Sequence, residues 1–241
     1  MTKEEETILR EENGKHLFLD CKKKYSDEFY ERYVKNFRQP NNRKLVYRII
    51  KRSFDIVVSF VFLVLLLVPF LIIGIIIKID SKGPVFFKNR RVGRNGKVFF
   101  CLKFRSMGIN APAEIATSIF EDAQAYVTKV GRFLRKTSID ELPQLFNVFV
   151  GQMSIVGYRP LVPSERNCND MRNKLGVFDM RPGISGYSQV QGRDDVYYKN
   201  KAIMDAFYVC NAGIIMDVKI LFASVFVVIN KKGNKDSTSF E

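Results

Sequence analysis

Basic side chains next to turn-forming glycines and prolines recur through the second half of the chain. Arginine binds phosphate through two parallel hydrogen bonds, and glycine lets the backbone approach an anion closely. Five separate groups of this kind favour a phosphate-rich ligand over an ordinary basic surface. Their side chains are Lys103 and Arg105, Arg135, Arg159, Arg181 beside Gly183, and Arg193.

Phosphoryl chemistry also requires carboxylates that hold Mg²⁺ or act as nucleophile or base. The candidates are Glu121-Asp122, Asp140-Glu141, Asp194-Asp195, Asp205 and Asp217. For Asp140-Glu141 a structural interpretation is favoured, because Ser138-Ile-Asp-Glu141 matches a capping box that opens a helix. Spacing alone does not rank the other candidates.

The overall composition limits the class of protein. The chain carries 39 Lys and Arg against 25 Asp and Glu, which indicates an anionic partner such as nucleic acid, anionic lipid or a phosphorylated substrate. A single histidine, His16, argues against a histidine-based triad. Four scattered cysteines without a CxxC pair indicate a reducing compartment, with neither a disulfide framework nor a zinc site. The acidic start is not typical of a secretory signal peptide.

These groups must be positioned relative to a long apolar segment, residues 54–77, which has no charge after Asp55. A straight helix of this length would measure about 36 Å, enough to cross a bilayer core of about 30 Å. However, Pro69 would kink it, and basic residues on both sides favour the cytoplasm for both ends. A re-entrant helix that breaks at Pro69 satisfies both observations; a kinked spanning helix is the alternative. Asp55 is expected to pair with Lys51 or Arg52.

Shorter patterns outline the remaining elements. Strands are expected over 85–88 and 97–104, joined by a hairpin loop at Gly93-Arg-Asn-Gly96. Helices are expected over 24–38, over 121–135 and from Ser138 onward, with loops at 151–165 and 181–186. The apolar segment 217–230 is too short to span a membrane and would pack in the core or lie at the membrane interface.

The ordered set of motifs resembles the bacterial sugar transferase family, the monotopic polyprenyl-phosphate phosphoglycosyl transferases of capsule and exopolysaccharide assembly. The resemblance covers about residues 46–230, and the order of the motifs is more specific than any one of them. The motifs are Lys51-Arg52-x-Phe54-Asp55, Lys78-x-Asp80-Ser-x-Gly83-Pro84, Arg91-Val-Gly93-x-x-Gly96-Lys97, Lys103-Phe-Arg105-Ser-Met107, Leu134-Arg-Lys-Thr-Ser-Ile-Asp-Glu-Leu-Pro-Gln-Leu-Phe-Asn147, Gly151-x-Met153-Ser-x-Val-Gly157-x-Arg159-Pro160 and Arg181-Pro-Gly-Ile-Ser-Gly186-x-x-Gln189-Val-x-Gly-Arg193.

The resemblance implies an α+β fold in which a mostly helical catalytic domain with a small β-hairpin carries interfacial amphipathic helices. Its domains would be a charged N-terminal extension (1–45), a re-entrant membrane helix (46–79) and a catalytic domain (80–241) on the cytoplasmic face of the bacterial inner membrane. Such enzymes use Mg²⁺ and a ping-pong mechanism. A carboxylate attacks the β-phosphate of a UDP-sugar, UMP leaves, and the phospho-sugar passes to undecaprenyl phosphate.

Site residues follow from the same resemblance. The family's Asp-Glu pair would fall on Ala123 and Gln124, so Asp122 is assigned as nucleophile and Glu121 as its partner, both also as metal ligands. Tyr158 and Val68-Pro69 are further departures from the family pattern. The remaining assignments are Lys103 and Asp205 at the catalytic centre and Arg105, Arg135, Arg159, Arg181, Gly183, Gln189 and Arg193 on phosphate or nucleotide.

The expected partners are a UDP-sugar, undecaprenyl phosphate and anionic inner-membrane lipid, and a homodimer is compatible with the sequence. Two other functions remain open at this point. The chain could be an inactive membrane scaffold of the same fold. A nucleic-acid-binding membrane protein has only the net charge in its favour and lacks a recognisable module.

Overall fold

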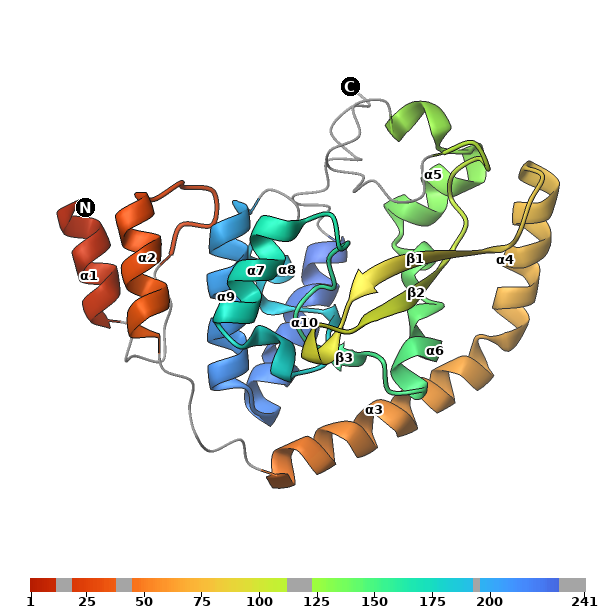
Figure 1. The fold of residues 1–241 in the computed structure, drawn as a ribbon. Helices are drawn as coiled ribbons and strands as arrows, with labels where there is room; N and C mark the ends of the chain where they lie inside the picture. The colour runs from red at the N-terminus through yellow and green to blue at the C-terminus, as the bar shows by residue number, and fades with distance from the viewer. Residues whose placement is uncertain (12–18, 38–44, 112–122, 193–195, 230–241) are drawn as a thin grey trace.

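The structure is a computed structural model that describes residues 1–11, 19–37, 45–111, 123–192 and 196–229 (Figure 1). It is mostly helical with two small sheets, an α+β architecture as expected. The α-helices are α1 (Lys3–Glu11), α2 (Asp27–Asn36), α3 (Leu45–Leu65), α4 (Leu67–Asp80), α5 (Lys129–Lys136), α6 (Gln144–Phe149), α7 (Arg166–Lys174), α8 (Tyr187–Gly192), α9 (Tyr198–Asn211) and α10 (Ile214–Ile229).

The predicted β-hairpin is confirmed. Strands β1 (Phe86–Val92) and β2 (Val98–Phe104) pair in antiparallel register, and a short 3₁₀ turn over Arg94–Gly96 joins them. Asn95 and Gly96 have φ values of 57° and 71°, the left-handed conformation that asparagine and glycine adopt most readily. β1 extends beyond the predicted end at Lys88. Its side chains go on alternating between more and less exposed positions as far as Val92.

The structure contains a second sheet that the sequence did not predict. Strands β3 (Ser154–Val156) and β4 (Gly183–Ser185) pair in parallel within segments expected to be loops. The two chains approach so closely that a Cβ atom on Gly183 would lie 2.1 Å from the Gly157 nitrogen. Strands of three residues show too little alternation to be recognised in a sequence. This sheet brings Gly183 beside the Arg159 segment.

The apolar segment forms a bent pair of helices, α3 and α4, along the edge of the molecule (Figure 1). Among the described residues no single helix is long and apolar enough to cross a membrane, whereas this pair, bent by 60°, passes the same test together. The bend lies at Leu66, so the prediction of a break at Pro69 was three residues too late. Pro69 sits in the first turn of α4, where a backbone N–H has no partner within the helix.

Charged side chains of α3 tie this helix to the rest of the molecule. Arg52 donates to the carbonyl oxygens of Val148 (2.7 Å) and Phe149 (2.8 Å) at the end of α6. The buried Asp55 accepts a hydrogen bond from the backbone N–H of Ile155 at 3.0 Å. The predicted ion pair of Asp55 with Lys51 or Arg52 is therefore wrong, because a backbone donor in β3 satisfies this carboxylate.

One expected helix starts later than predicted. In the described part of segment 121–135, the α-helix α5 starts only at Lys129, after a 3₁₀ turn over Ala123–Tyr126. The side chain of Thr128 caps α5 by accepting from the Gly131 N–H, which explains the late start. Among the residues of α10 whose exposure is described, only Ile220 is buried, and the exposed apolar residues include Ile215, Phe222 and Phe226.

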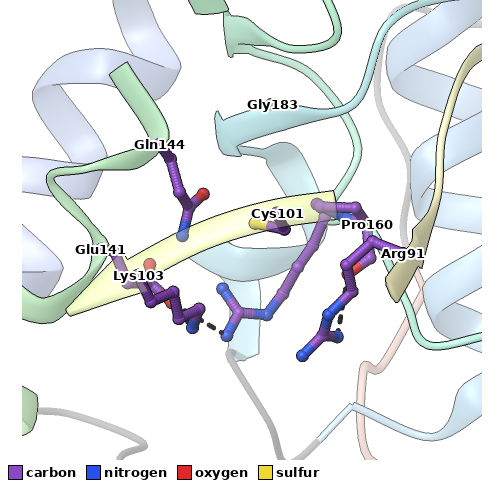
Figure 2. Close-up of a pocket in the computed structure, with 8 residues that line it drawn as sticks. Arg91, Cys101, Lys103, Glu141, Gln144, Pro160 and Gly183 are labelled. Atoms are coloured by element: carbon purple, nitrogen blue, oxygen red, sulfur yellow. Dashed lines mark hydrogen bonds and ion pairs between the residues drawn. The ribbon is translucent and has the colours of Figure 1, made fainter. Parts of the chain in front are cut away.

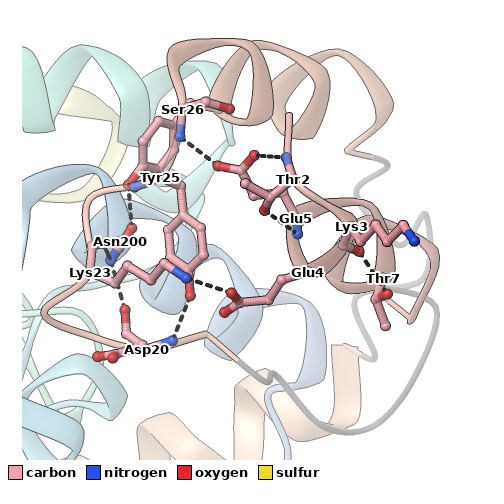
Figure 3. Close-up of polar contacts among 11 residues, drawn as sticks. Thr2, Lys3, Glu4, Glu5, Thr7, Asp20, Lys23, Tyr25, Ser26 and Asn200 are labelled. Atoms are coloured by element: carbon pink, nitrogen blue, oxygen red, sulfur yellow. Dashed lines mark hydrogen bonds and ion pairs between the residues drawn. The ribbon is translucent and has the colours of Figure 1, made fainter.

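The N-terminal extension packs against α9 (Figures 1 and 3). The predicted helix at 24–38 is confirmed as α2, but it does not lie loosely on the surface, since Phe29, Tyr30 and Tyr33 join the main hydrophobic core. Asn200 on α9 is the polar centre of the contact. It accepts from the Tyr30 hydroxyl at 2.7 Å and donates to the carbonyls of Asp20 (2.9 Å) and Lys23 (2.7 Å).

The Asn200→Ala variant is expected to lower the free energy of unfolding by at least about 2 kcal/mol, because it leaves buried hydrogen-bonding groups without partners. Thermal unfolding of the purified protein measures this. The matched control is Glu28→Gln, which removes an exposed carboxylate that pairs with Arg32 and with the Met1 amine, and it should change stability by less than about 0.5 kcal/mol. Equal effects of both substitutions would contradict the assignment of Asn200 as the anchor.

Candidate functional site

A pocket lies between the hairpin, the loop before α6, and the segment that follows β3 (Figure 2). Basic side chains surround a carboxylate inside it. Its lining residues are Arg91, Cys101, Lys103, Glu141, Gln144, Arg159, Pro160 and Gly183. The inward-facing positions of β1 and β2 supply Arg91, Cys101 and Lys103, because alternate residues of a strand point to the same face.

Glu141 is the acidic centre of this pocket. Its Oε1 lies 2.6 Å from Lys103 Nζ and 3.4 Å from a terminal nitrogen of Arg159. Figure 2 shows Lys103 and Glu141 meeting beside β2. Burial by itself would raise the pKa of Glu141, but the charges of Lys103 and Arg159 outweigh it and hold that pKa well below its usual range. Glu141 is therefore ionised at neutral pH.

The pocket has more positive than negative charge. Arg91 reaches into it and donates to the Pro160 carbonyl at 3.1 Å. Burial lowers the pKa of Arg91, and the neighbouring Arg159 lowers it further. Three basic side chains thus face the single carboxylate of Glu141 among the lining residues. Such a site attracts a multiply charged anion.

Asp140 precedes Glu141 and is 7% exposed. Burial raises the pKa of Asp140 to about 6, against the opposing charge of Lys103. No hydrogen bond to its carboxylate is found among the described residues. In this pair Glu141 forms an ion pair with Lys103, whereas the carboxylate of Asp140 accepts no hydrogen bond from the described residues.

The predicted capping box at Ser138 was wrong. Ser138 adopts a left-handed conformation (φ 57°) and makes no capping bond through its side chain. A 3₁₀ turn over Ile139–Glu141 follows, and α6 begins only at Gln144. The turn directs Glu141 toward Lys103, 38 residues earlier in the chain. Glu141 therefore lines the pocket, next to the buried Asp140, and this pair does not cap a helix.

Several residues expected at the site lie at or near the pocket. Lys103, Arg159 and Gly183 line it. Arg135 donates to the Ser106 hydroxyl at 2.9 Å, and its charge opposes the raised pKa of Asp140. Gln189 donates to the Ile184 carbonyl, in the strand that begins with Gly183.

Two arginines that were expected to bind phosphate donate to backbone carbonyls outside the pocket. Arg105 is buried and donates to carbonyl oxygens at the end of α4, those of Lys82 at 2.7 Å and Ser81 at 2.6 Å. Arg181 donates to the Gly151 carbonyl at 2.8 Å. Neither lines the pocket. Both arginines anchor backbone in the structure.

Asp205 is fully buried in α9 and does not line the pocket. Its carboxylate forms an ion pair with the buried Arg172 and accepts from the Ser188 hydroxyl. Arg172 in turn donates to the Arg159 carbonyl at 2.9 Å. Asp205 is thus connected to the pocket indirectly, through Arg172 and the Arg159 backbone.

Glu121, Asp122 and Arg193 lie outside the described residues, so their predicted roles stay predictions. Within the described ranges no group of three or more His, Cys, Asp or Glu side chains is arranged to hold a metal ion. The residues that sequence reasoning missed are Arg91, Gln144 and Arg172, and it favoured a structural role for Glu141. The available signal was that Asp140-Glu141 lies within the motif over residues 134–147, although the family's Asp-Glu pair would fall upstream, on Ala123 and Gln124.

The chain matches known proteins over most of its length. The bacterial sugar transferase family matches residues 46–231. An undecaprenyl-phosphate galactose phosphotransferase of Salmonella typhimurium is 40% identical over 212 residues, 81% of this chain and 44% of that protein. The exopolysaccharide production protein ExoY of Sinorhizobium fredii is 36% identical over 198 residues, 76% of this chain and 87% of that protein.

A UDP-glucose:undecaprenyl-phosphate glucose-1-phosphate transferase of Escherichia coli is 36% identical over 188 residues, 75% of this chain and 40% of that protein. The chain therefore spans less than half the length of several relatives but most of ExoY. The matched region begins at the second residue of α3 and includes every residue of the pocket. The chain belongs to the bacterial sugar transferase family.

Proposed function

We propose that the protein transfers a sugar-1-phosphate from a UDP-sugar to undecaprenyl phosphate and releases UMP. The observation that carries this is the carboxylate of Glu141 in a pocket lined by Arg91, Lys103 and Arg159, with the buried Asp140 next to it in the chain. The names of the relatives, which act on undecaprenyl phosphate or serve exopolysaccharide production, support the same reaction. The product would start assembly of a capsule, exopolysaccharide or related glycan.

The reaction proceeds through a covalent intermediate on Asp140. An oxygen of the Asp140 carboxylate attacks the β-phosphorus of the UDP-sugar, and the bond from that phosphorus to the bridging oxygen breaks. UMP leaves with the electron pair. A phosphate oxygen of undecaprenyl phosphate then attacks the phosphorus of the intermediate and displaces the carboxylate. Asp140 is favoured over Glu141 because Glu141 is held by Lys103. Asp122 remains the competing assignment.

Lys103, Arg159 and Arg91 stabilise the charge that develops on the phosphoryl oxygens and on UMP as it leaves. Magnesium usually binds one or two carboxylates together with substrate phosphates, and the Asp140-Glu141 pair beside an anion pocket fits that pattern. Glu121 and Asp122 are the other proposed ligands. The ion supplies additional neutralisation of the diphosphate when bound.

The bent pair of α3 and α4, with basic residues before and after it, supports insertion into one leaflet from the cytoplasmic side of the inner membrane. The exposed apolar residues of α10 fit a helix that lies at the same interface. This arrangement would present the pocket to a soluble nucleotide sugar and to a lipid-borne phosphate.

Release of UMP from a panel of UDP-sugars, with undecaprenyl phosphate and Mg²⁺, tests the function. The expected result is turnover with lipid and a stoichiometric burst of UMP without it. Intact mass should then show one phospho-sugar adduct on the protein. EDTA should stop turnover, and Mg²⁺ should restore it. Binding of UDP-sugar without any UMP release would instead favour an inactive scaffold of the same fold.

The rate of the first step is expected to rise with pH through about 6, because only the ionised Asp140 attacks and burial raises its pKa to about that value. Burst rates from pH 5 to 8 measure this. Glu141→Gln removes a negative neighbour that raises the pKa of Asp140, so the rising limb should move to lower pH. A burst rate that does not change between pH 5 and 8 would contradict the assignment.

A further inference from the structure

Four arginines gather on the side of the molecule where α3 meets the end of α6. Arg48 and Arg52 lie one turn apart on α3 and share a face. Arg52 donates to Phe149, and Arg181 donates to Gly151 in the same turn. Arg94 donates to the Asp179 carbonyl, two residues before Arg181. We call Arg48, Arg52, Arg94 and Arg181 the arginine cluster.

The cluster is an electrostatically unfavourable arrangement in the protein alone. Burial lowers the pKa of Arg181, and the charges of Arg52, Arg94 and Arg48 lower it further. The carboxylate of Asp55 opposes this effect but is already bound to the Ile155 N–H. Asp179 is also adjacent, through its backbone contact with Arg94. Three guanidinium groups and one carboxylate, that of Asp55, thus act on Arg181, and an anion would relieve the repulsion among the arginines.

The surroundings of the cluster indicate what kind of anion it binds. The turn that Arg52 and Arg181 hold carries exposed apolar side chains, Phe149 and Val150, which are 38% and 49% exposed. Phe149 contacts Phe60 of α3 at 6.0 Å between ring centroids. Arg48 lies between the exposed Val46 and Ile49. A ligand here meets positive charge next to apolar surface.

We propose that the arginine cluster binds the phosphate headgroup of an anionic bilayer phospholipid, whose acyl chains lie against α3, Phe149 and Val150. This site is separate from the pocket, since none of the four arginines lines it. The proposal rests on the proposed insertion of α3 and α4 into the membrane. The bound lipid would lie where α3 leaves the headgroup region of the membrane.

Binding of short-chain phosphatidylglycerol to the full-length protein in neutral detergent, followed by native mass spectrometry, tests the site. A basic residue near a membrane surface contributes about 1 kcal/mol toward anionic lipid, which is roughly fivefold in affinity. Arg48→Gln should therefore weaken phosphatidylglycerol binding roughly fivefold. Adding Arg94→Gln should weaken it roughly 25-fold, and phosphatidylcholine binding should not change.

The matched control is Lys174→Gln, which removes one exposed charge from α7, outside the cluster. It should bind phosphatidylglycerol like the wild type. Unchanged binding by the Arg48 and Arg94 variants would overturn the proposal. So would displacement of the lipid by millimolar inorganic phosphate, which would indicate a site for free anions. Weaker use of undecaprenyl phosphate with unchanged phosphatidylglycerol binding would assign the cluster to the acceptor. Absence of UMP release by the wild type would reject only the proposed function, because lipid binding is measured without turnover.

Discussion

The Asp140→Asn variant is expected to lose at least about 10³-fold in kcat for UMP release, because an amide cannot form the acyl-phosphate bond. The substitution preserves size and leaves the Lys103–Glu141 ion pair intact. UDP-sugar should therefore still bind. Stopped-flow or quenched measurement of the UMP burst, together with intact mass, gives the direct readout: neither burst nor adduct should appear.

Asp122→Asn is the control that separates the two candidate nucleophiles. If Asp140 carries the intermediate, Asp122→Asn retains the burst and the adduct, whatever its effect on turnover. An adduct that persists in Asp140→Asn and disappears in Asp122→Asn would reverse the assignment. Peptide mapping of the wild-type adduct gives the same answer without any substitution.

The Asp205→Asn variant is expected to lose about 3–5 kcal/mol of unfolding free energy, because it leaves the buried Arg172 without its counter-charge. Arg172 also donates to the Arg159 carbonyl, so the variant that remains folded should bind UDP-sugar more weakly. Chemical unfolding in detergent and the KM for UDP-sugar measure the two effects.

Asp170→Asn makes the same chemical change at an exposed position of α7 and should leave both quantities unchanged. Replacing both partners, in Arg172→Met with Asp205→Leu, should cost less stability than Asp205→Asn alone, since no charge is then buried unpaired. A double variant less stable than the single one would contradict the buried-charge explanation.

Sequence patterns predicted the elements that depend on residues close together in the chain. The alternation in β1 and β2 and the Asn95-Gly96 turn lie within one stretch of chain, so the hairpin was predictable. The apolar segment and its break were also predictable. The position of the break was not, since Pro69 is compatible with the first turn of a new helix.

The candidate site was harder to predict because its contacts join distant segments. Ser138-Ile-Asp-Glu141 satisfies the capping pattern, yet Glu141 binds Lys103, 38 residues away. Arg105 has the residue type and neighbours of a phosphate ligand, but the carbonyls of Lys82 and Ser81 accept from its terminal nitrogens. Arg181 donates to the Gly151 carbonyl through Nε and lies outside the pocket. A sequence shows which groups can bind an anion, whereas the tertiary structure decides which of them are already used.

The last two residues of strand β2 and the residue after it have three different partners. Lys103 binds Glu141 in the pocket, Phe104 packs against Phe70 of α4, and Arg105 holds the carbonyls at the end of α4. No flexible linker separates these contacts. With α4 inserted as proposed, the hydrophobic thickness of the bilayer would set the height of α4 and, through one strand, the position of the lysine that meets the substrate. A change in bilayer thickness would then change the geometry of the pocket.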